Sequence, residues 1–412
     1  MADQPLIKIE KLYKLFGKDP GKHMDLVHQG LSKDEILKRT GHTLGLKDIN
    51  LSINRGEIFV IMGLSGSGKS TLIRHFNRLI DPTEGNVIVE DQNIMSFDRK
   101  SLRLFRQKKM SMVFQRFGLM PHNTVIDNVA FGLKAQGVEK GERLQQSRQW
   151  LKDVGLEGYE EQYPAQLSGG QQQRVGLARA LCTNAEILLM DEAFSALDPL
   201  IRSEMQDQLM ELQSRLHKTI VFITHDLDEA LRIGDRIAIL RDGQLIQVGE
   251  PADILLHPVD DYVESFIRDV NRARALSVDT VMKPAIHRIS AKTVGDALKE
   301  MRTSKQSYAY NVNDDGYQGA LALDQLEEID EKDHSAELSD DHYYDTDINV
   351  ESSAAIEAII PDTLDQDYPI PVVDEGELKG EVSRETIAGV LTSTKEEGAA
   401  DDSDDKQDKT DD

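Results

Sequence analysis

The chain has 412 residues, enough for two or three domains, and its formal net charge is −25. Its apolar runs fall short of the roughly 18 residues that a membrane-spanning helix needs, and no signal peptide is expected at its start. Its single cysteine, Cys182, excludes an internal disulfide and suits a reducing cytoplasm. Residues 277–412 hold 35 acidic and 12 basic residues against 38 and 36 in residues 1–276, which argues against nucleic acid or anionic lipid as a partner of the C-terminal part.

The N-terminal segment combines a predicted strand with two aromatic residues. Apolar and polar side chains alternate in residues 6–10, as in a half-buried strand. Tyr13 and Phe16 follow, shortly before a turn. Either ring could stack on a nucleotide base or, equally well, cover a sheet edge. Residues 18–46 are interpreted as an insertion, in which a short amphipathic helix is predicted to start at Ser32.

The segment Gly63–Ser70 fits the phosphate-loop pattern G-x-x-x-x-G-K-[ST] at every fixed position. A predicted buried strand, residues 57–62, precedes it and a predicted helix, residues 70–79, follows it, which favours nucleotide binding over a chance match. Glycines allow backbone N–H groups to point at phosphate oxygens, Lys69 is expected to hold the β- and γ-phosphates, and Ser70 is expected to ligate Mg²⁺. The residues predicted to bind the nucleotide here are Gly63, Ser65, Gly66, Gly68, Lys69, Ser70 and Thr71.

Further polar side chains follow other predicted strands. Residues 186–190 predict a buried strand that delivers Asp191 and Glu192 to the edge where open α/β sheets bind ligands. Asp191 is predicted to bind Mg²⁺ and Glu192 to polarise the attacking water, with helix capping as the alternative. Gln115 and His225 also end predicted strands, where they could reach the metal or the water and the γ-phosphate respectively. Each of them alone is more often a structural residue.

A second helix start with phosphate-binding character lies in residues 167–181. Ser168 and two glycines precede a long predicted helix, whose N-terminal N–H groups can bind phosphate. Because this stretch lies far along the chain from the first loop, it is able to serve a different nucleotide, one held by a partner copy.

Past residue 276 the pattern changes to a weakly repeated α/β unit. The predicted helices and strands occupy residues 278–283, 294–301, 309–312, 319–323, 354–360, 370–374, 378–382 and 383–391. The last stretch, residues 394–412, is strongly acidic and has no apolar pattern, so we expect a disordered tail.

These motifs together resemble the ATP-binding-cassette (ABC) ATPases. Residues 167–171 read LSGGQ, the signature of that family. The other family motifs occur in the family's order, namely Walker A at 63–70, the Gln115 loop, Walker B at 187–192, the D-loop at 195–198 and the switch His225. The resemblance implies an α/β P-loop ABC ATPase domain in residues 1–276, with a mixed sheet and a helical subdomain at about 116–180.

The resemblance also implies how the site is assembled. Two copies are expected to form a head-to-tail dimer, in which each ATP lies between the Walker A loop of one copy and the signature of the other. The nucleotide contacts that the resemblance adds are Phe16, Ser168, Gly169, Gly170, Gln171 and Asp198. The implied catalytic residues are Glu192, His225 and Gln115, and the implied Mg²⁺ ligands are Ser70, Gln115 and Asp191.

Three stretches restrict the resemblance to one subfamily, namely the insertion, residues 59–65 and residues 189–202. They resemble the ATPase subunit of bacterial glycine betaine/proline uptake systems that respond to osmotic stress. In that family Phe16 matches the base-stacking position better than Tyr13. The family further implies a transmembrane permease that contacts residues 115–122, an indirect substrate-binding protein, no nucleic acid, and a peripheral position on the cytoplasmic face of the membrane.

The C-terminal part resembles the paired cystathionine-β-synthase-type (CBS) modules of that family. Residues 280–284 resemble the beginning of the first module, and residues 371–380 resemble a strand–turn–strand of the second. The expected modules are residues 277–332 and 333–393. Members of the family can bind cyclic di-AMP there, although the first module has Asp-rich loops where nucleotide contacts would be expected.

Three alternatives stay open at the level of sequence. The same architecture could import choline, carnitine or an amino acid, because the solute is chosen by other subunits. A soluble ABC protein of translation or DNA repair would usually carry two ATPase domains or a long coiled-coil insertion. A vestigial ATPase in a regulatory protein is disfavoured because Lys69, Asp191, Glu192 and His225 are all present.

Overall fold

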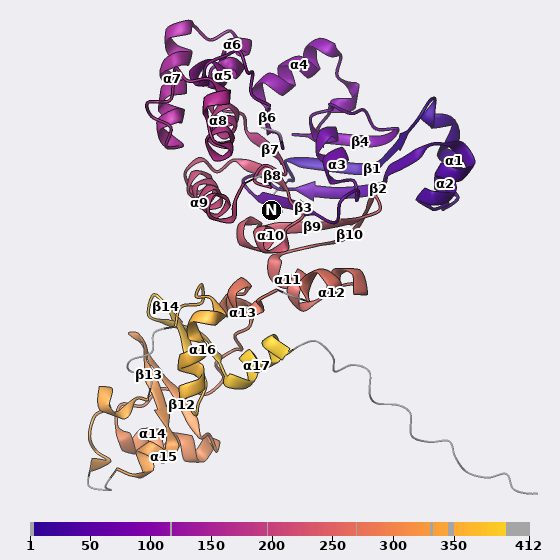
Figure 1. Ribbon diagram of the computed structural model, residues 1–412. Coiled ribbons are helices and arrows are strands. Elements are labelled where there is room, and N and C mark those ends of the chain that lie inside the picture. The colour runs from indigo at the N-terminus through magenta and orange to yellow at the C-terminus, as the bar shows by residue number, and fades with distance from the viewer. Residues whose placement is uncertain are drawn as a thin grey trace, which may run out of the picture. The chain divides into compact units, whose positions relative to one another are not determined.

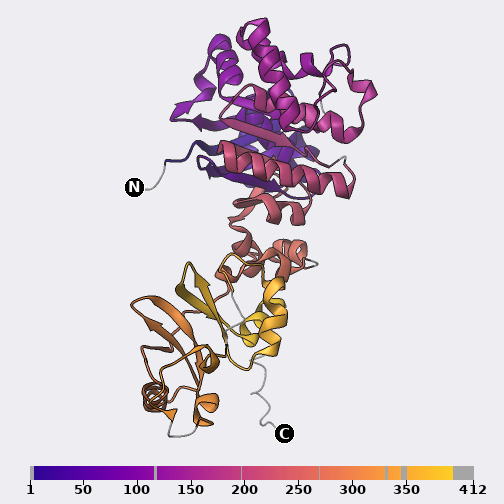
Figure 2. The same cartoon turned by 90° about the vertical axis from the view of Figure 1, so that its left-hand side faces the viewer.

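The computed structural model describes residues 4–115, 118–195, 197–268, 270–329, 333–344 and 350–392. The chain divides into two compact units, residues 1–270 and 271–412, and each is described by itself (Figure 1; Figure 2). The division lies at residue 270 rather than at the expected 276, because the short helix α13 (Arg272–Ala275) packs against two helices of the second unit. In the described part of the chain, no helix is long and apolar enough to cross a membrane. The predicted acidic tail, residues 394–412, lies outside the described residues.

The first unit contains an antiparallel sheet of strand order β2-β1-β4-β5. Its strands are β1 (Ile7–Phe16), β2 (Thr43–Ile53), β4 (Glu84–Val89) and β5 (Gln92–Asn93). The insertion between β1 and β2 forms η1 (Pro20–His23), α1 (Met24–His28) and α2 (Lys33–Thr40). The helix predicted at Ser32 is confirmed, since the Ser32 hydroxyl accepts from the Glu35 N–H and the Glu35 carboxylate accepts from the Ser32 N–H.

A second, larger sheet has the order β10-β9-β3-β8-β7-β6, with only β10 antiparallel to its neighbour. Its strands are β3 (Ile58–Met62), β6 (Met110–Val113), β7 (Ile187–Asp191), β8 (Thr219–Ile223), β9 (Arg236–Arg241) and β10 (Gln244–Gly249). The central strands are apolar on both faces, as expected for parallel strands covered on both sides. Helix α3 (Lys69–Phe76) shares one hydrophobic core with both sheets, so it lies between them (Figure 1).

A separate group of helices extends beyond the β6 edge (Figure 1). It consists of α5 (Val125–Val129), α6 (Phe131–Gln136), α7 (Lys140–Asp153) and α8 (Gly169–Cys182) around its own apolar core. Cys182 belongs to that core, and burial raises the pKa of its thiol to about 11. Cys182 therefore packs as a small core residue at the end of α8.

The remaining helices of the first unit line the sheets or follow them. They are η2 (Ile94–Ser96), α4 (Arg99–Lys108), η3 (Pro164–Gln166), α9 (Pro199–Leu216), α10 (Leu227–Ile233), α11 (Pro251–Leu256) and α12 (Asp261–Ile267). Asp198 caps α9, since its carboxylate accepts from the Ile201 N–H at 3.1 Å.

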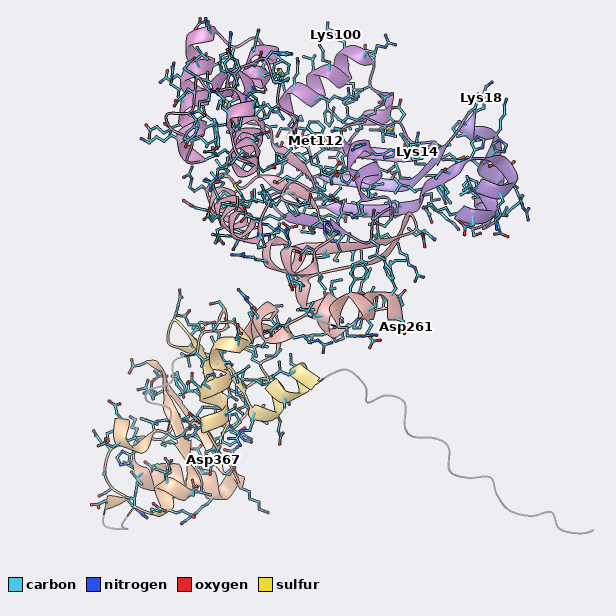
Figure 3. All side chains as sticks on the ribbon, in the orientation of Figure 1. Lys14, Lys18, Lys100, Met112, Asp261 and Asp367 are labelled. Carbon is cyan, nitrogen blue, oxygen red and sulfur yellow. The ribbon has the colours of Figure 1, made fainter. Side chains whose placement is uncertain are left out.

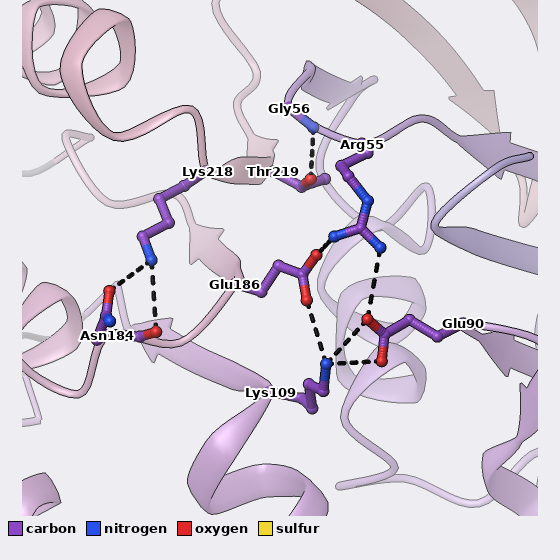
Figure 4. A network of polar contacts seen from close by, with 8 residues as sticks. All are labelled: Arg55, Gly56, Glu90, Lys109, Asn184, Glu186, Lys218 and Thr219. Carbon is purple, nitrogen blue, oxygen red and sulfur yellow. Dashed lines mark hydrogen bonds and ion pairs between the residues drawn. The ribbon is translucent and has the colours of Figure 1, made fainter. Parts of the chain in front are cut away.

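A charge network closes the edge of the large sheet at which its parallel strands begin (Figure 4). Lys109, before β6, lies 2.7 Å from a Glu90 oxygen and 3.3 Å from a Glu186 oxygen, and Arg55 contacts the same two carboxylates. The hydrogen bond from Lys109 lowers the pKa of Glu90, which keeps this carboxylate charged. Two cations and two anions therefore neutralise each other here, and the opposite edge of the sheet is left to carry the functional groups.

The second unit repeats one pattern of elements. After η4 (Val278–Thr280), the first half contains β11 (Arg288–Ile289), α14 (Val294–Ser304), β12 (Tyr308–Asn313), β13 (Gly316–Ala322) and α15 (Leu323–Glu327). After η6 (Asp340–His342), the second half contains α16 (Ile356–Asp365), β14 (Ile370–Asp374), β15 (Glu377–Val382) and α17 (Arg384–Thr392). In both halves a helix precedes an antiparallel strand pair and a second helix follows it. The sequence predicted this order for the second half, whereas in the first half it did not predict α15.

The prediction of a helix at residues 278–283 is wrong, because only the short turn η4 forms there. The backbone of Lys283 instead exchanges hydrogen bonds of 2.9 and 2.8 Å with Glu381, which joins this segment to the edge of β15. A strand-like pairing of this kind is incompatible with an α-helix at the same residue.

Candidate functional site

The phosphate loop lies between β3 and α3, as its sequence predicted. Gly63, Gly66 and Gly68 have φ values of 145°, 81° and 108°, which side chains rarely adopt. At Gly63 a Cβ atom would also lie 2.2 Å from the carbonyl oxygen of Leu240. The loop therefore needs glycine for its turn and for its close approach to β9.

Lys69 is buried at the start of α3, with 4% of its surface exposed. Its ammonium group donates to the carbonyl oxygens of Gly63 at 2.7 Å and Leu64 at 3.1 Å, so it lies beneath the loop. Burial lowers the pKa of Lys69, while the carboxylates of Glu192 and Asp191 act in the opposite direction. A cation that is desolvated and held in this position is suited to bind phosphate oxygens.

Asp191 is the last residue of β7 and contacts Ser70, which follows Lys69 in the phosphate loop. The Ser70 hydroxyl donates to Asp191 Oδ1 at 2.8 Å, and Arg74 Nη2 lies 3.3 Å from Asp191 Oδ2. A hydroxyl and a carboxylate side by side are the oxygen donors that Mg²⁺ prefers, so these residues fit the expected metal. Sequence reasoning missed Arg74, although its spacing of four residues from Ser70 places both on one face of α3.

Glu192 follows immediately and has a left-handed backbone, with φ of 46°. One of its oxygens accepts from Gln115 Nε2 at 2.6 Å, and the other lies 3.9 Å from the Lys69 ammonium. The structure thus brings together three residues that the sequence placed far apart.

His225 lies two residues after β8, and it is exposed. Ile223, the last residue of β8, pairs with Ile61 of β3 and with Asp191 of β7. His225 therefore leaves the sheet at the same edge as the phosphate loop and the two carboxylates.

The signature residues and Asp198 form a second group. A cavity of about 570 Å³ is lined by Ser168, Gly169, Gly170, Gln171 and Asp198, together with neighbouring residues of α8 and α9. Ser168 caps α8, since its hydroxyl accepts from the Gln171 N–H at 3.3 Å. Among the described residues that line this cavity, none belongs to the phosphate loop. One copy of the chain therefore presents two separate groups of the residues predicted to bind nucleotide.

Phe16 is the last residue of β1 and its ring is 39% exposed. Its ring approaches Gly45 of β2 so closely that a Cβ atom there would lie 2.6 Å from Phe16 Cε2, and the Lys14 ammonium lies 5.1 Å from the ring centre. The carbonyl oxygen of Gly45 would in turn lie 2.9 Å from a Cβ atom at Gly68, so Phe16 is held beside the phosphate loop. Tyr13 instead packs on the core of the insertion, which leaves Phe16 as the ring that can meet a base.

Another cavity, of about 1090 Å³, lies on the antiparallel sheet. It is lined by residues of β1, β2 and β4 and by His28 of α1. Tyr13 borders this cavity, but none of the residues of the phosphate loop, the two carboxylates or the signature does.

The fold and these residues define an ABC-type ATPase, and comparisons with known proteins agree. The sequence pattern of the ABC transporter family matches residues 46–195. The dimeric ATP-binding cassette MJ0796 in a post-hydrolysis state bound to ADP and Pi is similar, with a TM-score of 0.52 and 33% identity over 60% of this chain and 98% of that one.

Full-length relatives are closer still. GbuA of Listeria monocytogenes serotype 1/2a (strain 10403S), a glycine betaine/carnitine transport ATP-binding protein, is 47% identical over 94% of this chain and 97% of its own. OpuAA of Bacillus subtilis (strain 168), a glycine betaine transport ATP-binding protein, is 47% identical over 95% of this chain and 93% of its own. ProV of Escherichia coli (strain K12), which serves glycine betaine/proline betaine transport, is 46% identical over 90% and 93%.

The chain therefore belongs to the ABC transporter family, as an ATP-binding subunit whose hydrolysis of ATP powers transport. Within that family it belongs with the ATP-binding subunits of glycine betaine transport systems. The P-loop ABC ATPase fold predicted from the sequence is confirmed.

Proposed function

We propose that this subunit drives the import of a compatible solute such as glycine betaine or proline under osmotic stress. Relatives that serve glycine betaine transport support the choice of solute. The pairing of two copies is supported by the separation of the two predicted nucleotide-binding groups, the phosphate loop with Glu192 and the cavity at Ser168 and Asp198. Each group lacks what the other supplies, so two copies arranged head to tail complete both sites. Closure of the pair on ATP and its opening after hydrolysis then provide the movement that a membrane subunit uses.

Within each completed site, the residues have distinct roles. Ser70, Asp191 and Gln115 would hold Mg²⁺, which would neutralise charge on the phosphates of ATP when bound. Lys69 and the N–H groups of the loop hold the β- and γ-phosphates, and Ser168 contacts the γ-phosphate from the partner copy. Glu192 accepts a proton from the attacking water and His225 contacts the γ-phosphate.

The membrane partner is proposed to contact the segment from Gln115 to His122, of which residues 116 and 117 lie outside the described residues. Gln115 supports this assignment, because its amide reaches the Glu192 carboxylate at 2.6 Å. A movement of this segment is therefore coupled to the group that polarises water. The contact places the chain at the cytoplasmic face of the membrane, with a substrate-binding protein acting through the permease.

The second unit is proposed to be a regulatory pair of CBS-type modules. Its repeated order of helix, strand pair and helix supports this interpretation. At the junction of the two halves the half-buried rings of Tyr308, Tyr344 and Tyr368 pack on one another and on the buried Tyr310, and these three rings offer surfaces on which the bases of cyclic di-AMP could stack. Titration of the full chain with cyclic di-AMP tests this, and an absence of saturable binding would reject that ligand.

Uptake by the complete transporter tests the proposed solute. We expect the chain to co-purify from its native membrane with a permease, and vesicles containing that complex to accumulate glycine betaine when ATP is enclosed on the side of this subunit. Proline, choline and carnitine serve as competitors that rank the alternatives. A complex that accumulates none of these compatible solutes would contradict the proposal.

A further inference from the structure

The insertion between β1 and β2 forms a small body with a core of its own. Its helices bury five apolar residues against the ends of the two strands, namely Leu15, Met24, Val27, Ile36 and Leu44. Because two of these five, Leu15 and Leu44, belong to β1 and β2, the insertion packs directly on the strand ends. Phe16 is the last residue of one of those strands and pairs with Thr43, the first residue of the other.

His42 joins the two ends of the insertion. It is 7% exposed, and its ring nitrogens Nδ1 and Nε2 each lie 2.8 Å from a carbonyl oxygen, that of Thr40 and that of Lys18 respectively. Carbonyl oxygens only accept hydrogen bonds, so the ring nitrogen that carries the proton donates to the carbonyl oxygen beside it. His23 of η1 stacks against the same ring, with 4.4 Å between ring centres.

Gly17, the residue between Phe16 and Lys18, leaves room for the His42 ring. Gly17 has φ of 149°, and a Cβ atom there would lie 2.0 Å from His42 Cδ2. The imidazole therefore occupies the space that any other residue at position 17 would fill. Phe16 and Gly17 lie in the sequence between Lys14 and Lys18, which are labelled in Figure 3.

We infer that His42 is a positioning residue for the base of the bound nucleotide. By holding the Gly17–Lys18 backbone, it fixes Phe16 from one side, while Gly45 and Lys14 fix the ring from the other. The inference rests on the proposed role of Phe16 as the base-stacking ring. It gives the insertion a function in the ATPase cycle, namely to set how firmly the base is held.

A base-free ligand separates this role from a general structural one. Inorganic tripolyphosphate with Mg²⁺ can use the phosphate loop, but it has no base to stack on Phe16. A residue that acts through Phe16 therefore affects the binding of ATP and leaves the binding of tripolyphosphate unchanged. A residue that merely supports the fold affects both ligands.

The test measures calorimetric affinities of the full chain for Mg-ATP and for Mg-tripolyphosphate. We expect Phe16→Ala to weaken ATP binding about tenfold and His42→Phe, which keeps a ring but removes both ring nitrogens, to weaken it about fivefold. Tripolyphosphate binding should be unchanged in both variants. Gly17→Ala, which displaces the imidazole from the opposite side, should reproduce the effect of His42→Phe, and Lys38→Gln on the exposed face of α2 is the matched control.

The outcomes distinguish the two claims. If Phe16→Ala weakens both ligands equally or neither, then the proposed base platform is wrong. If Phe16→Ala acts on ATP alone but His42→Phe and Gly17→Ala do not, the platform stands and the positioning role of His42 is rejected. Equal losses for both ligands in the His42 and Gly17 variants would also overturn the inference, because they indicate general disruption.

Discussion

Replacing Lys69 by alanine is expected to reduce ATP binding and turnover about 100- to 1000-fold, as judged by calorimetry and by release of phosphate. Its ammonium group is buried beneath the phosphate loop, whereas Arg74, another cation of α3 near this site, is paired with Asp191. Removing it leaves the charge of the β- and γ-phosphates without its desolvated partner.

The control for this variant is Lys8→Ala, which removes the same side chain from an exposed position on β1. It should leave ATP binding unchanged. The unfolding temperature of both variants shows whether the loop has collapsed, because Lys69 also satisfies the carbonyl oxygens of Gly63 and Leu64. Normal ATP affinity in a folded Lys69→Ala protein would disprove the assignment of the phosphate loop.

Replacing Glu192 by glutamine is expected to lower the rate of ATP hydrolysis about 10²- to 10⁴-fold while ATP still binds. The substitution preserves size and removes the charge that accepts a proton from water. Lys69, Ser70 and Asp191 remain in place, so the ATP-bound dimer should form and persist. Size-exclusion chromatography with ATP then shows a dimer that the unaltered protein populates only briefly.

Glu211→Gln, the same chemical change on the exposed face of α9, is the matched control and should hydrolyse ATP normally. Hydrolysis by the Glu192 variant at the unaltered rate would reject Glu192 as the catalytic base. Slow hydrolysis without a persistent dimer would instead place the defect in binding.

Local patterns were sufficient to predict most of the site. The phosphate loop has a fixed spacing between two apolar periodic segments, and Asp191 and Glu192 follow a strand that is apolar on both faces. Because neighbouring parallel strands end at the same edge, the sequence also placed Gln115 and His225 near them. These expectations depend on chemistry that is local in the chain.

Contacts between distant segments could not be predicted in the same way. The approach of Gly45 to Phe16 depends on the register of β1 and β2, which shifts at three points along the pair. The imidazole of His42 replaces a side chain at Gly17, and neither residue carries a pattern that points to the other. The boundary at residue 270 was also missed, because α13 belongs to the second unit through packing alone.

The most direct measurement for the whole account mixes two inactive variants, Lys69→Ala and Ser168→Arg. If each ATP site uses the phosphate loop of one copy and the signature of the other, a mixed dimer has one complete site. An equal mixture should then recover about a quarter of the unaltered ATPase rate, because half of the dimers are mixed and each has one working site of two. A mixture that remains as inactive as either variant alone would show that both groups must act within one chain, and would contradict the account.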